Sequence, residues 1–230
     1  MNILPGLMLT AIGLALAAPD VAAQELSSYR NAHLGMEVTA IAALTGSTAA
    51  DATVVYRRPT PIRELVSRSG RVGAGTAAND PVQDIVFTFY DDALFRIVAT
   101  YDRGRIAGLT DADLINGLSA QYGTATIPAA AVTTSRLSQA GRDNAERIIA
   151  RWEDAEFSVN LIRYSYASTV SLVMFSKPLD ALAREAIVEA ARLDLLEAPA
   201  REAARQERSE IEARAAEDKA RLANKPAFRP

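Results

Sequence analysis

The sequence predicts an α+β fold in which helices pack on an antiparallel sheet and a long helix ends the chain. Three observations lead to this prediction. Two short helical patterns end at glycine, runs of alternating apolar and polar residues follow each of them, and residues 180–230 carry charges at helical spacing. A hydrophobic content of 49% and a charged content of 23% are typical of a globular protein.

Residues 1–23 have the pattern of a signal peptide. An apolar stretch covers residues 3–18, and Val21-Ala22-Ala23 presents the small residues that a signal peptidase recognises. We therefore expect cleavage after Ala23, a periplasmic location and no transmembrane segment in the mature chain. A membrane anchor is the alternative, but the apolar stretch is shorter than the ~20 residues that a spanning helix needs.

Two short helices are predicted, at residues 35–46 and 108–123. Gly46 and Gly123 are typical C-terminal stops, and Thr110 is a typical N-cap with acidic residues in the first turn after it. The apolar residues at helical spacing are Val38, Ile41, Ala42 and Leu44 in the first helix and Leu114, Ile115, Leu118 and Tyr122 in the second.

Alternation of apolar and polar residues predicts the strands. They are expected at residues 53–57, 85–90, 94–101, 147–152, 157–166 and 169–175, whereas most of residues 45–83 shows no clear pattern. A helix precedes each group of strands, and the glycines that open the two helices, Gly35 and Gly108, are 73 residues apart. We therefore expect tandem helix-plus-sheet units at residues 34–103 and 108–176.

Residues 24–179 are expected to form the folded domain, and residues 180–230 a charged helical tail. An apolar stripe predicts an amphipathic helix at residues 179–198 that packs on the domain; its members are Leu179, Leu182, Ala186, Ala190 and Leu193. Pro199 is expected to interrupt this helix. Beyond Pro199 the charges alternate in sign, so we expect a solvated helix that adds little to folding.

One face of the predicted sheet is the candidate binding surface. Alternation directs Phe87, Phe89, Phe157 and Leu161 to the core and their neighbours to the opposite, outward face. Tyrosine among small polar residues is typical of protein-binding surfaces. The candidate binding residues are Tyr90, Arg96, Asn160, Tyr164 and Tyr166. The alternative is that the tail helix covers part of this face.

No catalytic residue, metal site or cofactor is expected. The chain has no cysteine, and its single histidine, His33, lies in a linker without any nucleophile motif. The closest acidic pairs, Asp91-Asp92 and Asp111/Asp113, fit a hairpin turn and the start of a helix. The net charge of −3 argues against nucleic-acid binding, which requires a basic excess.

Two further features lie between residues 57 and 76. Gly70–Thr76 holds three glycines, but their spacing matches neither a dinucleotide-binding motif nor a P-loop, so we expect a flexible loop. Five arginines fall within the fifteen residues from 57 to 71: Arg57, Arg58, Arg63, Arg68 and Arg71. Either a solvated loop or contact with an anionic partner would explain this cluster.

The spacing of several of these residues resembles a known family. Gly35, Met36, Val38, Leu44, Gly46, Phe89, Leu94 and Ile97 resemble the pattern of the small outer-membrane-assembly lipoprotein (SmpA/OmlA) fold. Two such units in tandem resemble the β-lactamase-inhibitor-protein architecture, which implies a sheet with a partner-binding face. The chain departs from these patterns at Thr45, which separates Leu44 from Gly46, and in having no lipobox cysteine and no disulfides. The whole chain is also similar to uncharacterised exported proteins of Gram-negative bacteria.

Together these observations favour a non-enzymatic periplasmic binding protein or cell-envelope-associated protein. Its expected partner is another envelope protein, and neither the partner nor the oligomeric state follows from the sequence. A hydrolase that works through carboxylates is the alternative.

Overall fold

A computed structural model describes residues 25–68, 80–128, 146–164, 169–226 and 229. In chain order the elements are β1 (Ser28–Tyr29), β2 (Ala32–His33), α1 (Val38–Thr45), the 3-10 helix η1 (Ala49–Asp51), β3 (Thr53–Tyr56), β4 (Ile62–Arg68), β5 (Val82–Tyr90), β6 (Ala93–Tyr101), α2 (Asp111–Tyr122), β7 (Glu146–Glu153), β8 (Phe157–Tyr164), β9 (Thr169–Ser176) and α3 (Lys177–Asn224). The predicted signal peptide, the Gly70–Thr76 loop, Arg71 and Tyr166 lie outside the described residues.

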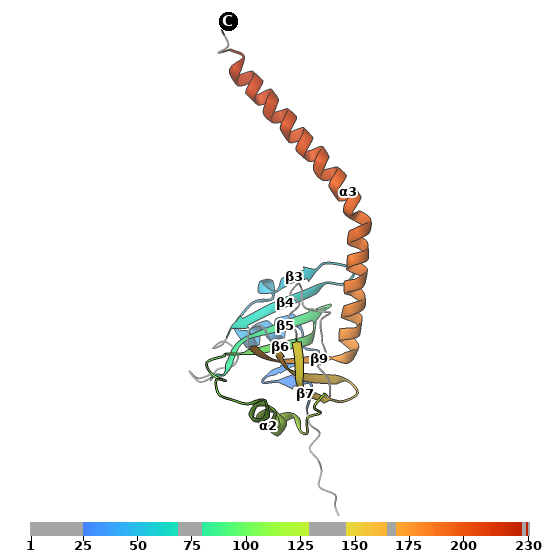
Figure 1. Cartoon of the computed structure of the whole chain (residues 1–230). Helices are drawn as coiled ribbons and strands as arrows, with labels where there is room; N and C mark the ends of the chain where they lie inside the picture. The colour runs from blue at the N-terminus through green and yellow to red at the C-terminus, as the bar shows by residue number, and fades with distance from the viewer. Residues whose placement is uncertain (1–24, 69–79, 129–145, 165–168, 227–228, 230) are drawn as a thin grey trace, which may run out of the picture.

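Seven strands form one antiparallel sheet in the order β3-β4-β5-β6-β9-β8-β7 (Figure 1). Strands β4-β5-β6 and strands β7-β8-β9 each follow one another along the chain, and the two groups meet where β6 pairs with β9. Strands β1 and β2 form a separate two-stranded sheet. The α+β class with a long C-terminal helix is therefore confirmed.

Local signals set the two short helices. The left-handed Gly46 ends α1, where its N–H donates to the carbonyls of Ala42 and Ala43. Thr110 and Asp113 form a capping box at the start of α2, with the Thr110 N–H donating to the Asp113 carboxylate at 2.8 Å. Both predicted helices are confirmed, although they begin three residues after the glycines that precede them.

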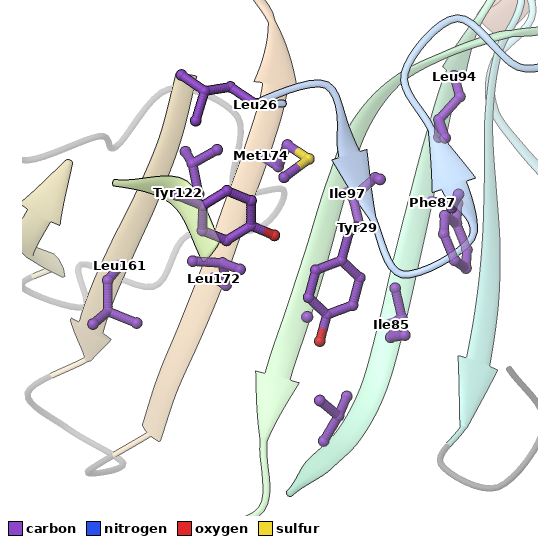
Figure 2. Packing of buried hydrophobic residues seen from close by; sticks show 14 of the residues in the cluster. Leu26, Tyr29, Ile85, Phe87, Leu94, Ile97, Tyr122, Leu161, Leu172 and Met174 are labelled. Atoms are coloured by element: carbon purple, nitrogen blue, oxygen red, sulfur yellow. The ribbon is translucent and has the colours of Figure 1, made fainter. Parts of the chain in front are cut away.

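The main core lies on one face of the sheet, which we call the inner face. Side chains from the central strands pack there against the β1-β2 hairpin, α1 and the end of α2. Figure 2 shows Tyr29 and Tyr122 close to strand residues such as Ile97, Leu161 and Leu172. Phe87, Phe89 and Leu161 are at most 1% exposed, so their predicted core positions are confirmed. Phe157 is only half-buried.

The prediction that Pro199 interrupts the C-terminal helix is wrong. Helix α3 continues for 48 residues with Pro199 inside it, and it changes direction part-way along (Figure 1). Proline removes one backbone N–H and therefore frees the carbonyl of residue 195. Leu195 is 78% exposed, so water can satisfy that carbonyl, and the helix bends instead of ending.

The first half of α3 packs on the domain, as predicted, but through a rotated face. Ala183, Ala186 and Ala190 are buried, whereas Leu182, which was expected to pack, is 46% exposed. The side chains of Arg58 and Glu197 form an ion pair that adds a second attachment beyond this contact.

We expect that truncation after Pro199 leaves the melting temperature within about 4 °C of the full-length value. Nearly every described residue beyond it is exposed, and its ion pairs, such as Arg214 with Glu210, join neighbours on the same helix surface. Thermal unfolding followed by circular dichroism measures the shift. A much larger drop would show that the distal helix packs on the domain.

Candidate binding face

The sheet face opposite the main core, here called the outer face, is only partly open. Tyr90 lies on it, as predicted, but packs with Ile62, Phe95 and Ala183 of α3 in a small apolar cluster. The tail helix therefore covers the Tyr90 end of the face, which is the alternative weighed from the sequence.

Asn160 also lies on the outer face, but it is buried and only 3% exposed. Its side-chain oxygen accepts a hydrogen bond from the Arg151 Nε at 2.8 Å, and its amide donates to the Ser158 hydroxyl at 3.0 Å. The expectation of an accessible Asn160 is thus corrected, because these bonds satisfy the amide inside the protein. Tyr164 is half-buried and packs against a cluster of Ile148, Ile162 and Val173.

Arg96 lies at the margin of the helix-covered region. It pairs with Thr88 across the β5-β6 ladder, next to a bulge in which Phe95 is the extra residue. The guanidinium acts electrostatically on the carboxylates of Glu64 on β4 and Asp180 on α3. Within the described part of the chain, its buried Nε has no hydrogen-bond partner. Among the predicted residues that the structure describes, Arg96 is therefore the one that is partly exposed and lies near two carboxylates.

The two carboxylates beside Arg96 were not predicted as site residues. Burial raises the pKa of Glu64, and the charge of Arg96 opposes this effect only in part. Burial likewise raises the pKa of Asp180, which is 3% exposed, although Arg184 and Arg96 act in the opposite direction. Glu64 fell in the segment without a clear pattern, and Asp180 in the tail, so no local signal marked either one.

An apolar strip extends from Arg96 across the uncovered part of the outer face. Val66, Val86 and Val98 are directly opposite one another on three neighbouring strands. Val66 is 54% exposed, and the other two are half-buried. We call these three residues the valine strip. The sequence did not predict the valine strip because it did not predict β4, the strand that carries Val66.

The acidic pairs considered for catalysis have structural partners. Asp111 accepts hydrogen bonds from Arg147 at 2.7 Å and from Arg163 at 3.0 Å, and Asp113 belongs to the capping box of α2. Asp91 and Asp92 occupy the β5-β6 turn with positive φ angles of 47° and 66°. Asp111 and Asp113 are thus held by structural contacts, and Asp91 and Asp92 form the hairpin turn.

His33 and two arginines of the cluster, Arg58 and Arg63, also have partners. An exposed contact of 3.1 Å joins the His33 ring to Glu25. In the arginine cluster, Arg58 pairs with Glu197, and Arg63 pairs with Asp92 at 2.9 Å. No group of three metal-ligating side chains was found among the described residues.

Comparisons with protein-family models, curated proteins and solved structures gave no match. In the ranges that the structure describes, no helix is both long and apolar enough to cross a membrane.

We expect Glu64 and Asp180 to change stability with pH in a direction set by their raised pKa values. As the pH falls, the folded state takes up these protons before the unfolded state does. A destabilising contribution present at about pH 7 is therefore lost by about pH 4, where the carboxyls of the unfolded chain are also protonated. The free energy of unfolding of the variant Glu64→Gln/Asp180→Asn, taken relative to that of the wild type, should therefore be higher at the higher pH. Urea unfolding of both proteins at the two pH values measures this difference. A difference independent of pH would contradict the prediction.

Proposed function

We propose that the protein is a non-enzymatic binding protein of the periplasm or cell envelope. It engages a protein partner through the open part of the outer face, at the valine strip and Arg96. The observation that carries this proposal is the exposed Val66 in register with two further valines, beside the partly exposed Arg96. The buried centre of a protein interface is more apolar than the rest of the surface, and arginine is enriched in interfaces.

This site differs from the one expected from the sequence. Tyr90 packs against α3, and Asn160 is buried in hydrogen bonds with Arg151 and Ser158, so the proposed contact moves toward β4 and retains Arg96. Tyr164 lies further along the same face, next to the buried cluster of Ile148, Ile162 and Val173, and can border the contact.

The sheet order also supports the tandem arrangement as part of this proposal. Helix α1 is followed by the four antiparallel strands β3 to β6, and α2 by the three strands β7 to β9. The last strands of the two halves pair at the centre. An approximate two-fold relation between the halves would produce this order. The resemblance to the outer-membrane-assembly lipoprotein fold belongs to the same proposal.

Affinity capture from a periplasmic extract, followed by binding measurements with the purified partner, tests the proposal. We expect Val66→Glu and Arg96→Gln each to weaken binding at least tenfold, since charge at an apolar contact and loss of a central arginine both disfavour association. Leu109→Glu is the matched control, because Leu109 is 48% exposed and precedes α2 on another part of the surface. Equal binding by all variants would refute the proposed contact.

The location is tested separately by the mass of the N-terminus. We propose that the leader is removed after Ala23, so the periplasmic fraction should contain a chain that begins at Gln24. Recovery of intact Met1 in a membrane fraction would contradict this part of the proposal.

A further inference from the structure

One exposed side of α3 carries an apolar stripe. Val188 is 71% exposed and Leu195 is 78% exposed, which makes them two of the most exposed large apolar side chains in the described chain. They belong to a series that alternates in steps of three and four residues, which is the spacing of a coiled-coil seam. We call this series the α3 seam: Ala181, Arg184, Val188, Ala191, Leu195 and Ala198.

The α3 seam is separate from the surface that holds the helix on the domain. The domain contact uses Leu179, Ala183 and Ile187, which pack with Ile62 and Phe95. All six seam residues are exposed. Figure 1 shows α3 along one side of the sheet, and helix geometry places the seam roughly a third of a turn around α3 from the domain contact.

We propose that the α3 seam binds the same seam of a second copy of this chain, with the two helices antiparallel. The seam has two alternating positions, one holding Ala181, Val188 and Leu195 and the other Arg184, Ala191 and Ala198. In an antiparallel pair, residues at the first position of one helix face residues at the second position of its partner. When Val188 is placed opposite the partner's Ala191, the remaining layers align as well. Leu195 then faces the aliphatic stem of the partner's Arg184, and Ala181 faces the partner's Ala198. Because the arrangement is symmetric, every contact occurs twice.

The charges beside the seam select this orientation. In the antiparallel register, Glu185 lies next to the partner's Arg192, and the two-fold axis repeats the attraction. A parallel register would instead bring Asp180 next to the partner's Glu185, which places like charges together. Arg192 already contacts Glu189 of its own helix at 2.6 Å on the exposed surface, and its guanidinium can lie between the two carboxylates.

The length of the seam limits the strength of the contact. From residue 181 to residue 198 a helix rises about 26 Å, and the bend around Pro199 carries the distal part of α3 in another direction. Only two large apolar side chains per copy are buried in the seam. We therefore expect a weak dimer that forms in the micromolar to submillimolar range and is separate from the contact at the valine strip.

Analytical ultracentrifugation of the full chain over a range of concentrations tests the dimer. Val188→Glu and Leu195→Glu should each weaken association at least tenfold without loss of circular dichroism signal, because both side chains are exposed in the monomer. Ile211→Glu and Leu222→Glu are matched controls, since these residues are 57% and 70% exposed on the same helix but lie outside the seam. A chain that stays monomeric up to about 1 mM, or controls that weaken association equally, would overturn the proposal.

A charge exchange tests the orientation. Glu185→Arg and Arg192→Glu should each weaken the dimer, and the double exchange should restore it, because only the antiparallel register places these two positions next to each other. The chain has no cysteine, so Val188→Cys/Ala191→Cys also allows a direct disulfide cross-link between copies. A double exchange that is no better than the single ones would refute the antiparallel register.

Discussion

Replacing Phe87 with alanine should cost about 3–5 kcal/mol of unfolding free energy. Phe87 is 1% exposed on β5, between Leu65 of β4 and Ile97 of β6. Its removal leaves a cavity at the centre of the sheet. The two neighbouring strands are held by their own pairing and cannot move in to fill it. Because a domain of this size is stable by only about 5–15 kcal/mol, the variant should lose a large fraction of its stability and unfold at a clearly lower urea concentration.

Phe157→Ala is the matched control. The sequence placed Phe157 in the core with Phe87, but Phe157 is half-buried at the start of β8, opposite Ser176. Its truncation should cost about half as much, since water can enter part of the space. Urea unfolding followed by tryptophan fluorescence measures both variants. Equal losses would show that the sheet is packed as tightly at its periphery as at its centre.

Replacing Trp152 with alanine is expected to destabilise the fold by a similar amount, about 3–5 kcal/mol. Trp152 is 2% exposed on the edge strand β7, and its ring centroid lies 6.1 Å from that of Tyr122. Its indole N–H donates to the Gly123 carbonyl at 2.8 Å, so it connects the end of α2 to the sheet. The alanine variant loses both the buried volume and the partner of that carbonyl.

Trp152→Phe separates these two effects. Phenylalanine retains most of the ring contact with Tyr122 but cannot donate to Gly123, so it should recover more than half of the lost stability. Urea unfolding is followed by circular dichroism, because Trp152 is the only tryptophan and the variants lack its fluorescence. If the phenylalanine variant is as unstable as the alanine variant, the hydrogen bond contributes more than the packing does.

Much of the secondary structure follows from local patterns, but β4 shows where this fails. Glycine and threonine mark the ends of α1 and α2, and alternation marks β5, β6 and the last three strands. In β4, the buried residues Ile62 and Leu65 are three positions apart and therefore belong to opposite faces of the sheet. No alternation results, so a strand between two covered layers cannot be distinguished from a loop.

The candidate site was harder to predict than the fold. Alternation correctly assigned Asn160 to the outer face, but it cannot show that Arg151 and Ser158 satisfy the amide there. The apolar stripe of α3 predicted that the helix packs, yet its orientation depends on the shape of the surface around Ile62 and Phe95. For the same reason, the burial of Asp180 and its proximity to Arg96 depend on tertiary contacts.

The pairing of β6 with β9 has a consequence for the order of folding. These neighbouring strands cover residues 93–101 and 169–176, so the middle of the sheet joins segments that are far apart in the chain. Until β9 has been synthesised, β6 presents an unpaired edge that can pair with other chains. Closing this distance requires a costly loop, which slows folding toward the millisecond-to-second range of sheet proteins with distant contacts. A growing chain thus has to remain incompletely folded through most of its synthesis, and its last strand completes the sheet.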